Sequence, residues 1–282
     1  MRILLNEQPV DVADGATADA VAAQRKPDAD LFIVNGFPVD RSAPLRAGDR
    51  LVLIHRGEVP PDDELEALMV ARHTPGIHAL LKRATVAIAG CGGLGSTVAL
   101  ALARVGVGCL ILADFDVVEP SNLNRQQYFV DQIGMLKVEA LKATIARVSR
   151  LVVVEPHALR LTAQNVPAIL GRADVIVEAF DRADQKEMLV STLLIEYPQK
   201  PIVLGVGMAG WGANALLHAR KVDNLYVCGD ETMEAGPYVG LMAPRVGVAA
   251  CLQANQVMEI LLGPDPAISN AASASRRQAI IS

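Results

Sequence analysis

The sequence predicts an α/β fold, in which a doubly wound, mainly parallel sheet follows a small β-rich domain. Three observations point to this fold. From residue 84 onward, short apolar runs typical of buried strands alternate with longer runs of helical composition. A glycine-rich turn, within "VAIAGCGGLGST" at residues 86–97, connects the first of these strands to the first of these helices. Before residue 58, short β-rich runs surround a single helical run, which indicates a separate and smaller unit.

Residues 1–57 have the element order of a ubiquitin-like β-grasp domain. "RILLN" and "VDV" flank a polar turn, "TADAVAAQRK" has helical composition, and "DLFIVNG" and "RLVLIH" are further β-rich runs. Residues 58–83 are predicted to be a linker and a helical arm. Pro60 and Pro61 interrupt regular structure, Asp62 and Asp63 suit a helix N-terminus, and "ELEALMVAR" continues as a helix.

Residues 84–264 are predicted to form a Rossmann-like domain. Its expected strands are "TVAIAG", "CLILAD", "LVVVEPH" and "DVIVEAF", and its expected helices are "GSTVALALARVG", "LKVEALKATIARV" and "AQNVPAILGR". Ligands of such sheets bind at the carboxyl ends of the strands. Residues 265–282 are small and polar until the last few, and we expect a flexible tail there.

Composition argues against nucleic acid and membranes as partners. The formal net charge of the 282 residues is −5, and no long block of Lys or Arg interrupts the sequence. The longest apolar runs are shorter than the roughly 18–20 residues that cross a bilayer. Polar residues interrupt the first apolar run, unlike in a signal peptide, so we expect a cytoplasmic protein.

The four cysteines predict reduced thiols and no structural zinc. Cys91, Cys109, Cys228 and Cys251 are widely separated, and no two of them have C-x-x-C spacing. Cys91 lies within the glycine-rich turn and is expected to be a packing residue. His73, His78 and His218 lack the spacing of metal ligands.

The glycine-rich turn predicts a nucleotide but leaves its chemistry open. Gly90, Gly92 and Gly95 satisfy the G-x-G-x-x-G pattern, in which the backbone approaches phosphate closely. Asp114 follows Gly90 by 24 residues, at the end of the second predicted strand. A carboxylate there accepts hydrogen bonds from ribose hydroxyls, which NAD and ATP share.

The residues downstream favour ATP. A dehydrogenase needs apolar contacts for adenine after its ribose-binding acid, whereas "DFDVVEPSNLNRQ" at residues 114–126 supplies Asp116 and several amides. Arg125 offers a planar set of donors for phosphate oxygens, and Lys137 adds a second cation. Asp181 follows the fourth predicted strand, where it would either hold Mg²⁺ between ATP phosphates or cap the next helix.

Five motifs together resemble the ThiF, MoeB and HesA family of adenylyltransferases, which are relatives of the ubiquitin-activating enzymes. They are "GCGGLGS", "DFDVVEPSNLNRQ", "GMLKVEAL", "EAFDRADQK" and "MAPRVGVAA", and the resemblance spans about residues 65–262 and is closest to the type-two ThiF subgroup. It implies ribose binding by Asp114, Mg²⁺ binding by Asp181 and a homodimer in which Arg72 reaches the ATP of the partner subunit. It implies phosphate binding by Gly93, Ser121, Asn122, Leu123, Asn124, Arg125 and Lys137.

The reaction that this resemblance implies is the activation of a sulfur-carrier protein in thiamine thiazole formation. The C-terminal carboxylate of the carrier attacks the α-phosphate of ATP, which gives an acyl-adenylate and pyrophosphate. The protein contributes positioning and charge neutralisation, and no side chain acts as a nucleophile in this step.

The first domain resembles ThiS, the β-grasp sulfur carrier of thiamine synthesis. Such carriers react through a free Gly-Gly carboxylate, whereas the corresponding place here is "HRGEVPP", with one glycine and a continuing chain. Our hypothesis is that this domain is a built-in docking or scaffolding module and that the substrate is a separate ThiS-like carrier.

Three other functions stay open at this point. One is that of the related dehydratase that cyclises threonylcarbamoyl-adenosine in tRNA, which also adenylates a carboxylate. A non-catalytic scaffold would bind a carrier without consuming ATP, and an NAD-dependent oxidoreductase would use the same glycine turn. Some relatives use a cysteine in the crossover loop, where Cys228 is expected, but it lies in an apolar run without basic neighbours.

Overall fold

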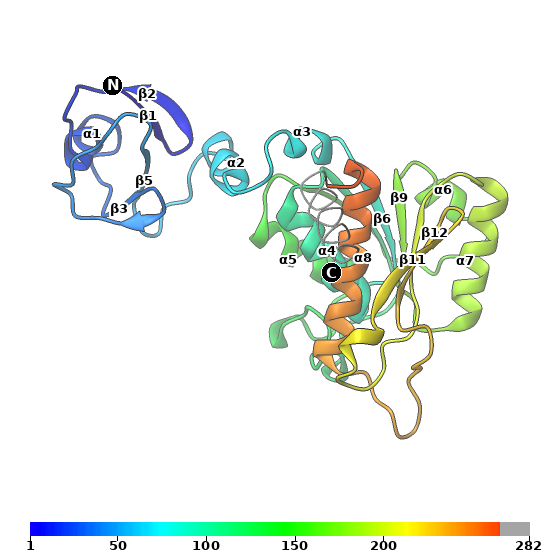
Figure 1. Cartoon of the computed structure of the whole chain (residues 1–282). Coiled ribbons are helices and arrows are strands. Elements are labelled where there is room, and N and C mark those ends of the chain that lie inside the picture. The colour runs from blue at the N-terminus through cyan, green and yellow to red at the C-terminus, as the bar shows by residue number, and fades with distance from the viewer. Residues whose placement is uncertain (266–282) are drawn as a thin grey trace, which may run out of the picture. The chain divides into compact units, whose positions relative to one another are not determined.

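The computed structural model describes residues 1–265 and divides the chain into two compact units, Met1–Pro75 and a second unit that begins at Gly76 (Figure 1). The division falls inside the segment predicted to be linker and arm, because the short helix α3 (Ile77–Leu81) packs against the last helix of the second unit. The predicted tail lies outside the described residues beyond Asp265. Among residues 1–265, no helix has the length and apolar character that a bilayer crossing requires.

The first unit is a β-grasp domain, as predicted. Its sheet has the order β2-β1-β5-β3-β4. The helix α1 (Ala18–Arg25) packs on the sheet through an apolar core that includes Val21, Phe32 and Leu51. The strands are β1 (Arg2–Leu5), β2 (Gln8–Asp11), β3 (Leu31–Val34), β4 (Phe37–Pro38) and β5 (Arg50–Ile54).

The chain that follows β5 is attached to its own β-grasp domain. The carboxylate of Glu58 lies 2.7 Å from Lys26 Nζ. Glu64, in α2 (Asp62–Val70), accepts a hydrogen bond of 2.6 Å from the side chain of the buried Asn6. These contacts hold the segment that follows β5 against the side chains of its own domain.

The second unit contains a doubly wound sheet, as predicted. Its order is β11-β12-β10-β9-β6-β7-β8, and all neighbouring strands are parallel except β11 and β12. The chain builds outward from β6 to β8 on one side and then returns to β9 on the other, so the winding reverses between β6 and β9. The strands are β6 (Thr85–Ala89), β7 (Cys109–Ala113), β8 (Val153–His157), β9 (Val175–Glu178), β10 (Ile202–Gly205), β11 (His218–Val222) and β12 (Leu225–Gly229).

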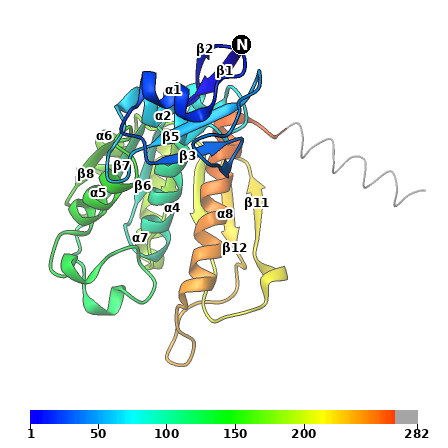
Figure 2. The same cartoon turned by 90° about the vertical axis from the view of Figure 1, so that its left-hand side faces the viewer.

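Helices cover both faces of this sheet. The helices α4 (Gly93–Val105), α5 (Lys137–Val148) and α8 (Ala243–Leu262) share one buried cluster, and Figure 2 shows them across one face. The helices α6 (Val166–Leu170) and α7 (Ala183–Glu196) share a second cluster on the other face. Within residues 1–265, the loops contain three short 3₁₀ turns, η1 (Pro120–Asn122), η2 (Val130–Gln132) and η3 (Asn214–Leu216).

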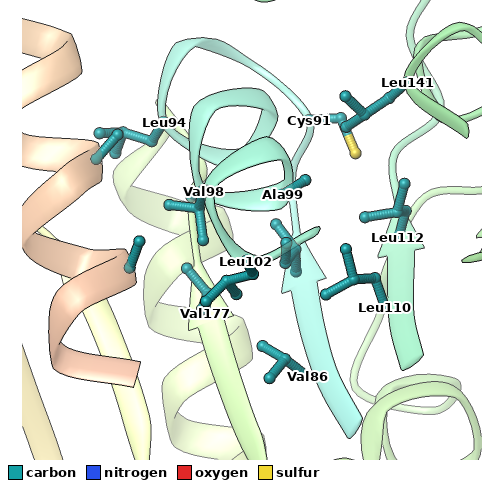
Figure 3. Close-up of a cluster of buried hydrophobic side chains, with 14 of the residues drawn as sticks. Val86, Cys91, Leu94, Val98, Ala99, Leu102, Leu110, Leu112, Leu141 and Val177 are labelled. Carbon is teal, nitrogen blue, oxygen red and sulfur yellow. The ribbon is translucent and has the colours of Figure 1, made fainter. Parts of the chain in front are cut away.

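Because both faces are covered, the central strand β6 is apolar throughout rather than alternating. Val86 and Ile88 face α4, whereas Ala87 and Ala89 face the other layer, and all four are fully buried. Figure 3 shows how Val98 and Leu102 of α4 meet the strands. This packing fixes the start of α4, which begins two residues earlier than the run "GSTVALALARVG" predicts.

The contact between α4 and the turn before it depends on Gly95. A Cβ atom at this position would overlap the carbonyl oxygen of Gly90. We therefore expect Gly95→Ala to reduce the free energy of unfolding by about 3 kcal/mol, since neither backbone segment has room to move. Denaturant unfolding of the two proteins measures this difference.

Gly247→Ala is the matched control, because Gly247 also lies within a helix but has no atom within 4 Å of its Cβ position. This substitution should stabilise the protein by up to about 1 kcal/mol through helix propensity. Equal effects of the two substitutions would contradict the close contact at Gly95.

Candidate nucleotide-binding site

A cavity of about 490 Å³ lies at the carboxyl ends of the parallel strands. Its lining comes from the segments that follow β6, β7, β8, β9, β10 and β12, together with the starts of α5 and α8. The cavity thus includes the place where the winding of the sheet reverses, which is the usual ligand site of such folds.

The glycine turn forms part of the cavity lining through Gly90, Gly92 and Gly93. Gly90 has a φ of +94°, and a Cβ there would lie 2.8 Å from the carbonyl oxygen of Ala179. Gly93 begins α4, whose N-terminus has no side-chain cap. Its first amide N–H groups are therefore suited to phosphate oxygens.

Asp114 lies in the cavity and is buried. Its two carboxylate oxygens accept hydrogen bonds from the backbone N–H groups of Cys91, at 2.6 Å, and Asp116, at 2.8 Å. These bonds fix the carboxylate beside the glycine turn. Since an ionised carboxylate has about four acceptor positions, Asp114 can still accept a hydrogen bond from a ribose hydroxyl.

The two predicted phosphate-binding cations both line the cavity, but in different electrostatic states. Lys137, the first residue of α5, is buried, and its Nζ lies 3.0 Å from the carboxylate of Asp116. Arg125 donates to the carbonyl oxygen of Ser121 and to the side chain of Asn124, and within residues 1–265 it forms no ion pair. The charge of Arg125 is therefore the less compensated of the two.

Asp181 also lines the cavity and is exposed. It does not cap α7, because the N-cap residue is Arg182 and no side chain bonds to that helix end. No group of three or more potential metal ligands occurs in the described part of the chain. A single carboxylate fits Mg²⁺ only when phosphate oxygens and water complete the coordination, as is usual for this ion.

Several predicted residues do not line the cavity. Asn122 caps η1 by accepting a hydrogen bond of 3.1 Å from the backbone of Glu119. Ser121, Leu123 and Asn124 belong to the same loop, which holds Arg125 in place. Gly95 contacts the turn rather than the cavity. Arg72 belongs to the first unit, and its guanidinium lies beside Gly36.

Sequence analysis missed three other cations that line the cavity, Lys186, Arg160 and Arg182. Lys186 lies 2.8 Å from the fully buried carboxylate of Glu178 and also donates to the carbonyl oxygen of Gly205. Burial raises the pKa of Glu178, and the nearby ammonium opposes that shift. Arg160 stacks 4.8 Å from the ring centre of Phe115. An acid within the apolar run "DVIVEAF" is the signal that could have revealed Glu178 and its partner.

Cys228 is not in a crossover loop. It lies in β12, opposite Gly205 of β10, and is fully buried. Burial raises its pKa to about 12, so its thiol is neither accessible nor ionised at neutral pH. Cys91 is also fully buried within the apolar cluster under α4, which agrees with its predicted packing role.

Comparison with protein families identifies the class to which this site belongs. The ThiF family matches residues 68–278, and the family described as ThiS-like ubiquitin matches residues 1–57. The chain belongs to the ThiF family, and its first domain is a ThiS-like ubiquitin domain. The predicted family resemblance is thereby confirmed.

Curated relatives are named as adenylyltransferases. The chain is 31% identical to the adenylyltransferase and sulfurtransferase MOCS3 of Culex quinquefasciatus, over 67% of this chain and 44% of that protein. It is 30% identical to the molybdopterin-synthase adenylyltransferase of Salmonella typhimurium, over 64% of this chain and 74% of that protein. The chain thus spans less than half the length of the MOCS3 relatives.

Solved structures share the fold. The E. coli tRNA N6-threonylcarbamoyladenosine dehydratase TcdA, in complex with AMP, matches with a TM-score of 0.65 and 18% identity, over 77% of this chain and all of that chain. E. coli MccB with succinimide matches with a TM-score of 0.52 and 25% identity, over 66% of this chain and 58% of that chain. The TcdA match supports the architecture alone, because its sequence identity is low.

The burial of the cysteines predicts their reactivity. At pH 8, iodoacetamide should modify the exposed Cys251 first and the partly buried Cys109 more slowly. Cys91 and Cys228 should react only after unfolding, because burial raises the pKa of each thiol and so removes the reactive thiolate. Mass spectrometry of peptides from native and unfolded protein measures this order. Rapid labelling of Cys228 in the native protein would contradict its position in β12.

Proposed function

We propose that this chain is an ATP-dependent adenylyltransferase that activates the C-terminal carboxylate of a separate ThiS-like sulfur-carrier protein. The observation that carries the proposal is the gathering of Arg125, Lys137 and Asp181 around one cavity with the glycine turn and Asp114. The names of the curated relatives support ATP as the nucleotide.

In the proposed complex, Asp114 accepts a hydrogen bond from the ribose, and the N-terminus of α4 binds phosphate oxygens. Arg125 binds the phosphates directly. Lys137 interacts with the phosphates and also with the carboxylate of Asp116, which it contacts in the structure. Mg²⁺ would neutralise further phosphate charge, and Asp181 is the residue that would hold it.

The proposed reaction needs no nucleophile from this chain. A carboxylate oxygen of the carrier attacks the α-phosphorus of ATP, the bond to the oxygen between the α- and β-phosphates breaks, and pyrophosphate leaves. The contribution of the cavity is to hold the reactants in line and to stabilise the charge that moves onto pyrophosphate.

The first unit is proposed to be a docking module rather than the substrate. Its last strand continues into a chain that Lys26 and Asn6 fix, so no terminal carboxylate follows β5. We further propose a homodimer in which Arg72 of one subunit reaches the phosphates bound by the other.

The most specific part of the proposal is the identity of the carrier protein. The ThiS-like first domain favours a carrier of thiamine thiazole synthesis, whereas the Salmonella relative is named for molybdopterin synthase. Parallel assays with a ThiS-type carrier and with the small carrier subunit of molybdopterin synthase distinguish them. We expect the ThiS-type carrier to give the larger kcat/KM.

Carrier-dependent exchange of pyrophosphate into ATP tests the proposed reaction. The assay contains this protein, ATP, Mg²⁺ and a ThiS-type carrier that ends in Gly-Gly. Lys137→Ala should lower kcat/KM by about 100-fold, because it removes a phosphate-binding cation and leaves Asp116 uncompensated beside the phosphates.

Lys142→Ala is the matched control, since Lys142 is exposed on the same helix and does not line the cavity. Its kcat/KM should stay within twofold of the unsubstituted protein. A lack of carrier-dependent exchange would contradict the proposed reaction. Binding of tRNA at physiological salt would instead favour the dehydratase, and carrier binding without exchange would favour a scaffold.

A further inference from the structure

A buried ion pair joins Asp230, which follows β12, to Arg245 near the start of α8. Their side chains are 0% and 3% exposed, and both lie outside the set of residues that line the cavity. Removing two charges from water is unfavourable, and an apolar pair of similar size often stabilises a protein as well or better. A buried pair of this kind can instead contribute conformational specificity.

The ion pair fixes three separate segments. One carboxylate oxygen of Asp230 accepts hydrogen bonds from the backbone N–H groups of Thr232, at 2.8 Å, and Met233, at 2.7 Å. The other accepts from Arg245, which also donates to the carbonyl oxygen of Gly212. The start of α8 is thereby tied to the loop after β12 (230–242) and to the loop after β10 (206–217).

The same two loops also bond directly to each other. The backbone N–H groups of Met208 and Ala209 both donate to the carbonyl oxygen of Met233, at 3.0 and 3.1 Å. Gly207 has a φ of +74°, and a Cβ there would overlap the carboxylate of Asp230. The two loops therefore form one preformed layer rather than two independent segments.

This layer lines one part of the cavity, through Met208, Met233, Glu234, Ala235 and Leu241. Its only charged lining residue is an acid, so it does not suit a triphosphate. An extended, uncharged peptide of small residues fits such a lining, provided that its terminal carboxylate reaches the cations elsewhere in the cavity. A carrier tail that ends in Gly-Gly has this chemistry.

We propose that Arg245 is a positioning residue for the acyl substrate. Through Asp230 it holds the two loops as a fixed wall, along which the C-terminal tail of the carrier lies when its carboxylate meets ATP. A wall that is already ordered lowers the conformational entropy lost on binding the tail. This inference rests on the proposed function, because it assigns a place to the carrier of that reaction.

Asp230 keeps its charge under the conditions of such an assay. Burial opposes ionisation, but the amide N–H groups of Met233 and Thr232 and the guanidinium of Arg245 together hold the pKa of Asp230 below its usual value. The pair is therefore intact throughout the neutral range.

The chain contains its own reporter of loop order. Trp211 is the single tryptophan, it precedes the Gly212 carbonyl that Arg245 binds, and its side chain is 83% exposed. The anisotropy of its fluorescence therefore reports the mobility of the loop after β10 without any label.

The experiment uses the full chain with the double substitution Arg245→Met and Asp230→Asn. The asparagine oxygen still accepts the amide hydrogen bonds, and no unpaired charge is left buried, so the protein should fold. We expect the KM for the ThiS-type carrier to rise at least tenfold, the Kd for ATP to stay within twofold, and the anisotropy of Trp211 to fall. The single substitution Arg245→Lys should give a carrier KM and a Trp211 anisotropy between those of the unsubstituted protein and the double variant. The lysine ammonium keeps the charge but lacks the planar set of donors of arginine.

The matched control is Arg220→Met, which removes the exposed ion pair of β11 with Glu231, the neighbour of Asp230. It should leave all three measurements unchanged. An unchanged carrier KM in the double variant, or equal losses in ATP and carrier binding, would overturn the assignment of Arg245. An unsubstituted protein that shows no carrier-dependent exchange would instead contradict the proposed function itself.

Discussion

The close approach of α4 to the turn that precedes it is the constraint on which the site depends. Only glycine at position 95 lets the helix start so near the end of β6. The helix N-terminus then lies at the edge of the sheet, between the loops that follow β7 and β9. In this position the backbone N–H of Cys91 can donate a hydrogen bond to the carboxylate of Asp114. The contact between two backbone segments thus determines the positions of the α4 N-terminus and the Asp114 carboxylate, the groups that we propose bind the phosphate and the ribose of a nucleotide.

Most of the cations that line the cavity lie beside a carboxylate before any ligand binds. Lys137, Lys186 and Arg182 each lie beside a carboxylate, whereas Arg125 has only neutral acceptors. Among the described residues, Arg160 also forms no ion pair and stacks on Phe115. An anionic ligand therefore meets two cations without a carboxylate partner, and three whose charge it must share with a carboxylate. The affinity for polyphosphate should accordingly depend on rearrangement of these pairs as well as on the number of cations.

Local sequence patterns predicted the strands and helices of this fold better than they predicted which side chains contact one another. The alternation of apolar and helical runs placed the central strands, and the position of Asp114 after an apolar run placed it at the carboxyl edge. The contact of Lys137 with Asp116 and that of Arg245 with Asp230 depend instead on how loops pack in three dimensions. Cys228 was expected in a loop for the same reason. Its segment forms a strand by pairing with β10, and the local sequence does not show this pairing.

The chain that follows the first unit's last strand is attached to Lys26 and Asn6, and this attachment affects how much of the carrier-like domain is available to the enzyme. A separate carrier is consumed and regenerated in each cycle, and its concentration depends on its expression in the cell. A carrier fold whose end is fixed and whose chain runs on into the enzyme is present once per enzyme, at an effective concentration set by the connection and not by expression. As the docking module that we propose, the first unit would not be consumed, and its influence on the reaction would be the same in each turnover.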